Sequence, residues 1–99
     1  QIEPWLYEIR RVVSLREGLG VASFALAWTL EHLFRQRAAH RVYLEVTARN
    51  KRARRIYERH GFVLEGTYRD GYSNPTNGQF EDLCVYGLLA PEYEASSVT

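Results

Sequence analysis

The segment RVYLEVT, residues 41–47, constrains the fold more than any other part of the chain, because it alternates strictly between apolar and polar positions. A period of two places alternate side chains on opposite faces of a β-strand. The apolar positions on one face are Val42, Leu44 and Val46, and the polar positions on the other are Tyr43, Glu45 and Thr47. This is the clearest strand in the sequence, and the neighbouring elements can be assigned around it.

A helix is predicted directly after this strand. Asn50 can act as its N-cap, the helix continues to about His60, and Gly61 supplies the C-terminal stop. The apolar stripe of this helix follows i, i+3, i+4, i+7 spacing and consists of Ala53, Ile56, Tyr57 and His60. The stripe indicates a helix that packs on the sheet.

The region before residue 41 predicts a strand, a loop and a second helix. WLYEIRRVV, residues 5–13, is rich in β-branched and aromatic side chains and reads as a strand. SLREGLG, residues 14–20, reads as a loop. The run from Val21 to Arg37 has no Gly or Pro and is apolar nearly all round in its first half, so it predicts a largely buried helix. Its helical spacing begins with Val21, Phe24, Ala25 and Trp28, and the apolar surface continues with Leu30, Leu33 and Phe34.

The region after residue 61 predicts two strands, FVLEGTYRD (62–70) and QFEDLCVYGLL (79–89), joined by a loop with an Asn77–Gly78 turn signal. The chain is expected to fray after Tyr93. The order strand, helix, strand, helix, strand, strand implies a parallel pair followed by an antiparallel addition, which is an α/β fold with a mixed sheet.

Composition limits the class of protein. A chain of 99 residues with 45% hydrophobic side chains makes one domain with a modest core. No apolar run approaches the roughly 20 residues that span a bilayer, and residues 1–11 do not resemble a signal peptide, so we expect a soluble cytoplasmic protein. The single cysteine, Cys84, is expected to be buried as a thiol. The three histidines lack metal-ligand spacing, and no metal site is expected.

Charge is unevenly distributed along the chain. Residues 1–60 carry 12 basic and 6 acidic side chains, a net charge of +6, whereas residues 61–99 carry one arginine and six acids, a net charge of −5. The division can mark an anion site on the basic half, or two halves of one domain that attract each other. The basic side chains of residues 51–59 can also lie on a nucleic-acid backbone, but that helix interleaves no exposed aromatics, so nucleic acid is an unlikely partner.

Three features could carry chemistry, and each also has a structural explanation. REGLGVA, residues 16–22, can hold a phosphate at a helix N-terminus or can be a plain turn. Glu45 can be a general base or a solvated strand residue. Tyr57 can be a core aromatic, or it can donate a proton to a departing thiolate, because a phenol with a pKa near 10 is protonated at neutral pH.

The ordered combination of these segments resembles the GNAT superfamily of acetyl-CoA-dependent N-acetyltransferases, especially its RimI/RimJ/RimL-like branch. LEVTARNKRARRIYERHGFVLEGTYRD, residues 44–70, is similar to the C-terminal half of that family, with its Tyr-x-x-x-Gly-Phe step and its E-G-x-x-R-D strand. REGLG resembles the pyrophosphate loop, and residues 79–89 resemble the closing strand. The resemblance covers about residues 5–93.

The resemblance implies a role for each matching residue. The backbone of Val12 and Val13 would pair with the pantetheine arm of the cofactor and stabilise the oxyanion. The pyrophosphate would be held by Gly18, Leu19, Gly20, Val21 and Ala22. Asn50 would hydrogen-bond the cofactor arm, Glu45 would deprotonate the acceptor amine, and Tyr57 would protonate the leaving thiolate of coenzyme A. The acetyl group would pass from acetyl-CoA to a primary amine by direct attack, with a protein N-terminus or a small amine as acceptor.

The usual N-terminal strands of this family have no counterpart in the sequence. We therefore expect residues 1–93 to form a partial GNAT domain, with residues 94–99 as a flexible tail. The chain, which contains no methionine, is expected to be a piece of a larger enzyme or a half-domain that completes its sheet as a homodimer. The alternative function is a non-catalytic module that binds coenzyme A or mediates dimerisation.

Overall fold

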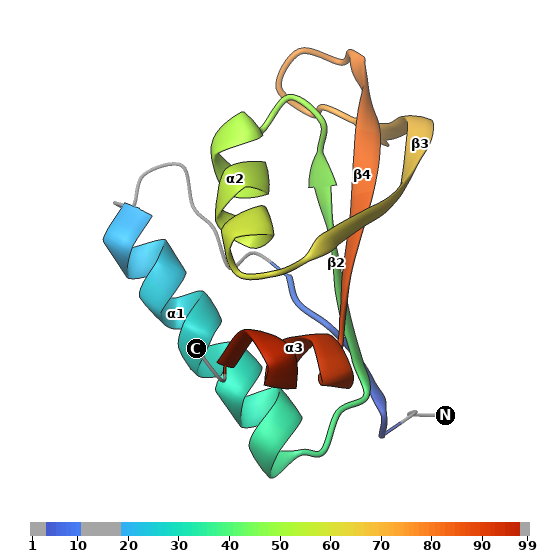
Figure 1. Cartoon of the computed structure of the whole chain (residues 1–99). Helices are drawn as coiled ribbons and strands as arrows, with labels where there is room; N and C mark the ends of the chain where they lie inside the picture. The colour runs from blue at the N-terminus through green and yellow to red at the C-terminus, as the bar shows by residue number, and fades with distance from the viewer. Residues whose placement is uncertain (1–3, 11–18, 98–99) are drawn as a thin grey trace.

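The computed structural model describes residues 4–10 and 19–97, and its element order confirms the strand and helix order that the sequence predicts (Figure 1). Two of the helical elements are continuous, because a short π-helix, η1, prolongs α1. The elements are β1 (Leu6–Glu8), α1 (Leu19–Glu31), η1 (His32–Gln36), β2 (Arg41–Thr47), α2 (Lys51–Arg59), β3 (Val63–Ser73), β4 (Phe80–Leu89) and α3 (Ala90–Ser97).

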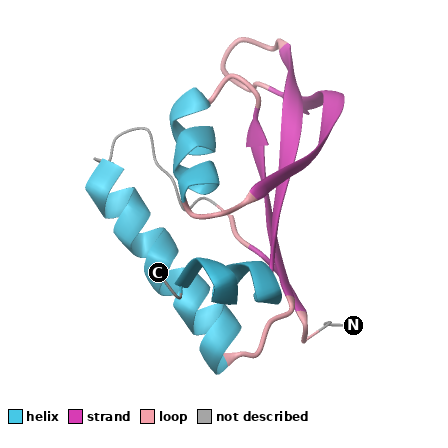
Figure 2. Ribbon diagram, viewed as in Figure 1, coloured by secondary structure: helices cyan, strands magenta, loops and turns pink. Residues whose placement is uncertain are grey.

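The described strands form one mixed sheet in the order β1-β2-β4-β3. β1 runs parallel to β2, and β4 pairs antiparallel with both β2 and β3. Helices α1 and α2 lie on the same side of this sheet (Figure 2). The parallel pair and the antiparallel addition are as the sequence predicts.

The core lies between these helices and the sheet. The face of β2 that carries Val42, Leu44 and Val46 is buried, as its alternation predicts. β4 pairs with it in register and adds Cys84, Tyr86 and Leu88 to the same buried face. Helix α2 covers this face with its predicted stripe of Ala53, Ile56 and Tyr57. Its ends are also as predicted, since Asn50 is the N-cap and Gly61 has a positive φ of 96°.

Helix α1 differs from its prediction in its start and in its buried face. It begins at Leu19 rather than Val21, so Gly20 is helical instead of lying in the loop. Phe24 and Trp28 are 75% and 63% exposed, and the buried row is Leu26, Leu30 and Phe34. The expectation of a largely buried helix is therefore wrong for one face. A stretch that is apolar on every side does not reveal which side will meet the sheet.

The C-terminal segment also differs from the sequence prediction. The chain continues as helix α3 through Ser97 rather than fraying after Tyr93. The Tyr93 ring stacks on Phe34 at 4.8 Å between centroids, and Arg35 lies over the same ring at 5.6 Å. The backbone N–H of Leu89 donates to the Glu92 carboxylate at the start of the helix. These contacts anchor α3 against η1.

The opposite face of the sheet carries no helix among the described residues. An ion pair crosses it, because both terminal nitrogens of the Arg41 guanidinium donate to the Glu65 carboxylate, at 2.7 and 2.8 Å. Gly87 lies between them, and a side chain there would overlap the carboxylate of Glu65. No described helix is long and apolar enough to span a membrane.

Candidate active site

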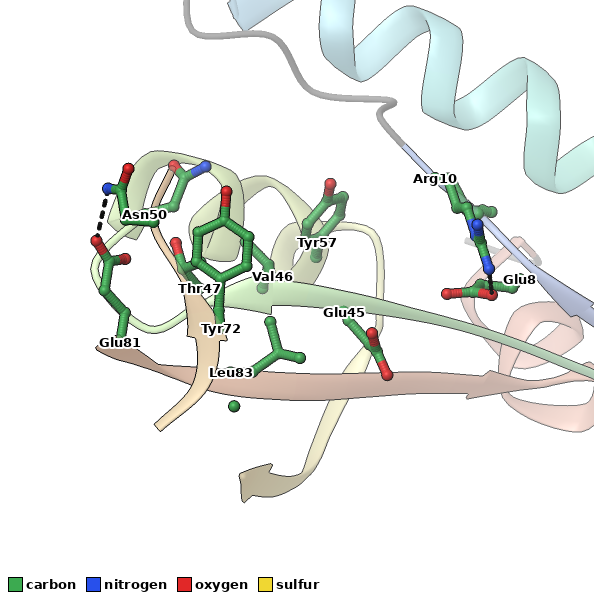
Figure 3. Close-up of a pocket in the computed structure, with 13 residues that line it drawn as sticks. Glu8, Arg10, Glu45, Val46, Thr47, Asn50, Tyr57, Tyr72, Glu81 and Leu83 are labelled. Atoms are coloured by element: carbon green, nitrogen blue, oxygen red, sulfur yellow. Dashed lines mark hydrogen bonds and ion pairs between the residues drawn. The ribbon is translucent and has the colours of Figure 1, made fainter. Parts of the chain in front are cut away.

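A groove opens where the parallel strands β1 and β2 separate. The backbone N–H of Ile9 donates to the Tyr43 carbonyl at 2.9 Å, and no described backbone hydrogen bond joins the two strands beyond that point. The separation leaves a groove of about 760 Å³ (Figure 3). Its lining residues are Glu8, Ile9, Arg10, Glu45, Val46, Thr47, Asn50, Tyr57, Gly71, Tyr72, Asn74, Glu81 and Leu83. Three predicted site residues, Glu45, Asn50 and Tyr57, are thus brought together.

Tyr57 enters the groove from helix α2. Its side chain is only 6% exposed, and its ring packs edge-on against Phe62 and at a tilt against Tyr86. The Tyr57 hydroxyl makes no hydrogen bond with the described residues. Every buried polar side-chain atom of the described residues has a hydrogen-bond partner, so this hydroxyl is not one of the buried atoms and must reach the groove. Burial raises the pKa of Tyr57, which keeps the phenol protonated at neutral pH.

Glu45 lies on β2 and points to the sheet face opposite the one that α2 covers. Its side chain is exposed, as the alternation of the strand requires. Tyr57 belongs to the covered side, so the two groups approach the groove from different faces of β2. A single molecule can contact both only at the edge of β2, where β1 has separated from it.

Asn50 caps helix α2 and also lines the groove. Its side-chain carbonyl accepts from the backbone N–H of Ala53 at 3.1 Å, which caps α2. The cap uses the oxygen of the amide, and the –NH₂ group has no partner among the described residues. An oxygen of a ligand in the groove could therefore accept a hydrogen bond from this –NH₂ group.

The groove carries more acidic than basic side chains. Among the described residues, Glu8, Glu45 and Glu81 line it, against Arg10 as the basic side chain. Arg10 pairs with Glu8 at 3.1 Å, and Glu81 accepts from the amide of Asn74 at 3.0 Å (Figure 3). Glu45 has no such partner among the described residues. The balance favours a cationic ligand on the side of Glu45.

A polar network beneath α2 escaped the sequence analysis. The Tyr86 hydroxyl donates to Glu58 at 2.7 Å and accepts from Arg54 at 2.9 Å. The sequence pattern assigned Arg54 to a basic flank and Tyr86 only to a strand. The signal available was the i, i+4 spacing of Arg54 and Glu58 above a strand that buries a tyrosine.

The predicted cofactor residues are only partly within the described chain. Val12, Val13 and Gly18 lie outside the described residues. Leu19, Gly20, Val21 and Ala22 form the first turn of α1, where backbone N–H groups have no intrahelical acceptor. The roles of all seven in cofactor binding remain predictions.

Comparisons with known proteins agree with the resemblance in the sequence. A model of the acetyltransferase (GNAT) family matches residues 7–62. The chain is 35% identical over 78 residues to “Putative ribosomal N-acetyltransferase YdaF” of Bacillus subtilis (strain 168), over 79% of this chain and 42% of that protein. Solved mutant forms of the spermidine/spermine N-acetyltransferase SpeG from Vibrio cholerae give a TM-score of 0.76 and 30% identity, over 82% of this chain and 46% of theirs. The chain spans less than half the length of these relatives.

Proposed function

This chain belongs to the GNAT family of acetyltransferases, and from that premise we propose that it transfers acetyl from acetyl-CoA to a primary amine. The observation that carries the proposal is the convergence of Glu45, Asn50 and Tyr57 on one groove at the separation of β1 and β2. These groups come from a strand, a helix cap and a helix. Their convergence supplies a base, a donor and an acid within one site.

Glu45 would act on the acceptor amine. A primary amine is mostly protonated at neutral pH, and it must lose a proton before its nitrogen can attack. The Glu45 carboxylate would take this proton directly or through a water molecule. Glu8 and Glu81 line the same groove and would favour the cationic form of the acceptor as it approaches.

Tyr57 and Asn50 would act on the side of the acyl donor. Acetyl-CoA supplies an activated thioester when it is bound. The groove fits such a ligand, because the Tyr57 hydroxyl and the Asn50 amide both have donor capacity that no described residue uses. The raised pKa of Tyr57 keeps a proton available for the departing thiolate. The first turn of α1, from Leu19 to Ala22, would hold the pyrophosphate.

The acceptor that we propose is a primary amine with further positive charge nearby. A protein N-terminus is the first choice and a small amine such as a polyamine is the second. Among the relatives, YdaF is named as a putative ribosomal N-acetyltransferase and SpeG as a spermidine/spermine N-acetyltransferase. The acidic lining of the groove suits either.

The experiment incubates the purified chain with radiolabelled acetyl-CoA and two acceptors, a basic peptide with a free N-terminus and spermidine. We expect transfer to at least one of them, and a rise in melting temperature with acetyl-CoA alone. A peptide with a blocked N-terminus and no lysine is the matched control acceptor. The proposal is refuted if the chain transfers acetyl to neither acceptor and its melting temperature does not change at acetyl-CoA concentrations about 1,000 times a plausible Kd.

A second candidate function is a non-catalytic module that binds coenzyme A and associates with another copy. β1 is an edge strand of the sheet, and the helix-free sheet face exposes Val63 and Tyr68. These features favour self-association through the sheet. The size of the protein in solution, measured with and without acetyl-CoA, tests it together with the transfer assay. Cofactor binding by a dimer without any transfer would favour the module, and transfer by a monomer would exclude it.

A further inference from the structure

Tyr86 is a buried titratable group that the proposed reaction does not use. It lies on β4 with its side chain 0% exposed and directed toward α2. Its hydroxyl accepts from Nε of Arg54 at 2.9 Å and donates to Oε2 of Glu58 at 2.7 Å. The hydroxyl therefore bonds to two residues one turn apart on the same helix.

Arg54 extends this network to the start of α2. One of its terminal N–H groups donates to the carbonyl of Ala48 at 3.1 Å, in the turn between β2 and α2. Asn50, which caps the helix, lies in the same turn. A single guanidinium thus connects β4, through Tyr86, to the segment that leads into the cap. The planar fork of an arginine fixes both bonds at once, which a lysine cannot do.

The same helix positions Tyr57. The Tyr57 and Tyr86 rings are in contact, with centroids 6.2 Å apart and planes at 52°. The Tyr57 hydroxyl has no hydrogen bond of its own among the described residues, so its place in the groove depends on ring packing and on the placement of α2. Any rotation or sliding of α2 on the sheet would move this hydroxyl directly. Displacements of about 1 Å can cost 10²-fold in rate.

We infer that Tyr86, held between Arg54 and Glu58, is a positioning residue that fixes α2 on the sheet and so aims the Tyr57 hydroxyl into the groove. The inference rests on the proposed function for its catalytic consequence. Tyr86 acts through Tyr57 and does not touch the reacting atoms. Its ring fills the core, while its hydroxyl sets the placement of the helix.

The kinetic test is a double-mutant cycle on the full chain. Tyr86→Phe keeps the ring and removes the hydroxyl, and we expect kcat to fall about 10-fold with KM changed less than about 2-fold. In the Tyr57→Phe background the same substitution should have no further effect, because the group that it aims is gone. Tyr68→Phe, on the exposed part of β3, is the matched control and should leave kcat unchanged. Equal losses from Tyr86→Phe in both backgrounds would overturn the inference.

The spectroscopic test does not need transfer activity. A 3-fluorotyrosine placed at position 57 reports the surroundings of that ring through its fluorine resonance. We expect Tyr86→Phe to shift and broaden this resonance, and Tyr68→Phe to leave it unchanged. A chain that transfers no acetyl group but shows this shift refutes the proposed function and supports the positioning role. An unchanged resonance in Tyr86→Phe overturns the positioning role whether or not the chain is active.

Two helix variants keep the test decisive if Tyr86→Phe does not fold. Glu58 is exposed, so Glu58→Ala leaves the core intact while it removes the acceptor of the Tyr86 hydroxyl. Glu58→Gln restores an acceptor oxygen at the same place. We expect Glu58→Ala to shift the fluorine resonance at position 57 and Glu58→Gln to return it toward that of the wild type. Identical spectra for these two variants would overturn the inference.

Discussion

At the scale of single residues, the two side chains of the proposed reaction, Glu45 and Tyr57, reach the groove from opposite faces of β2. Glu45 lies on the helix-free face of β2, and Tyr57 reaches the groove from the covered side. The two therefore should respond differently to substitution. In the proposed reaction, Glu45 would meet the acceptor and Tyr57 would meet the leaving group.

The first prediction concerns Tyr57 and Glu45. Tyr57→Phe should lower kcat about 10²-fold and leave the Kd of acetyl-CoA nearly unchanged, because the ring remains and only the proton donor is lost. Glu45→Gln should lower kcat by a similar factor at neutral pH and recover part of it as pH rises, since more acceptor amine is then already neutral. Steady-state kinetics across pH measure both.

Since burial raises the pKa of Tyr57, its ionisation should not reduce kcat below about pH 10. An alkaline loss of kcat at lower pH that Tyr57→Phe abolishes would contradict this.

Local patterns in the sequence placed these residues on their elements, and the resemblance to the GNAT family supplied their proposed roles. Glu45 belongs to an alternating strand, Asn50 to a cap position, and Tyr57 to a helical stripe. Tyr86 was missed because its partners, Arg54 and Glu58, are about 30 residues away in the chain and meet it only through the packing of α2 on β4. Local patterns do not encode such a meeting.

At the scale of elements, the order and direction of the strands followed from the sequence, but the orientation of α1 did not. Its first half is apolar on all sides, so several faces were compatible with burial. The structure buries the row of Leu26, Leu30 and Phe34 and exposes Phe24 and Trp28. The sheet face that the helix must cover decides which row is used, and that is a property of tertiary packing.

The second prediction follows from this orientation. Leu26→Ala should reduce the free energy of unfolding by about 2–5 kcal/mol, because Leu26 is 0% exposed and its removal leaves a cavity. Phe24→Ala removes a larger side chain of the same helix and should change the free energy of unfolding by less than about 0.5 kcal/mol. Urea unfolding followed by circular dichroism measures both. The reverse order of effects would mean that α1 packs through its other face.

The third prediction concerns the contact between α1 and α2. Ser23 and Nε2 of His60 lie 2.7 Å apart, and burial together with the Arg59 charge lowers the pKa of His60. A lowered pKa means that the unfolded chain binds the proton more readily. Stability should therefore be intact above the unfolded value of about 6.5 and decline as pH falls from there through the folded pKa.

The measurement compares wild type with His60→Gln, which can still hydrogen-bond Ser23 but does not titrate. Urea unfolding between about pH 7.5 and pH 5 should show a smaller loss of stability in His60→Gln. The two proteins differ only at position 60, so the difference isolates His60. Equal losses in the two proteins would contradict the prediction.

At the scale of the whole molecule, some basic side chains of residues 1–60 pair with acids of residues 61–99, and others are exposed. Arg41–Glu65 and Arg35–Glu94 each join a base from residues 1–60 to an acid from residues 61–99. Lys51, Arg55 and Arg59 on α2 are instead exposed, and no ion pair joins them to a described acidic side chain. The attraction between the two halves therefore has a structural counterpart in these ion pairs, and the anion site stays a prediction.

The fourth prediction follows for the proposed cofactor. The affinity for coenzyme A should fall as salt rises from about 50 mM to 200 mM, because exposed cations attract its phosphates and salt screens them. Lys51→Gln with Arg55→Gln should make this dependence shallower. Arg69→Gln, on β3, is the control that removes a cation elsewhere in the chain. Calorimetric titrations that give the same slope for all of these proteins would exclude a role for α2.

The separation of β1 from β2 has a consequence for how such a site can change over time. The groove is lined by residues of all four described strands and by Asn50 and Tyr57 of the α2 segment. Three side chains of this lining, Glu8, Tyr72 and Glu81, come from three different strands. Acceptor preference can therefore drift by exchange of rim residues such as Glu8, Tyr72 or Glu81 while the opening itself persists.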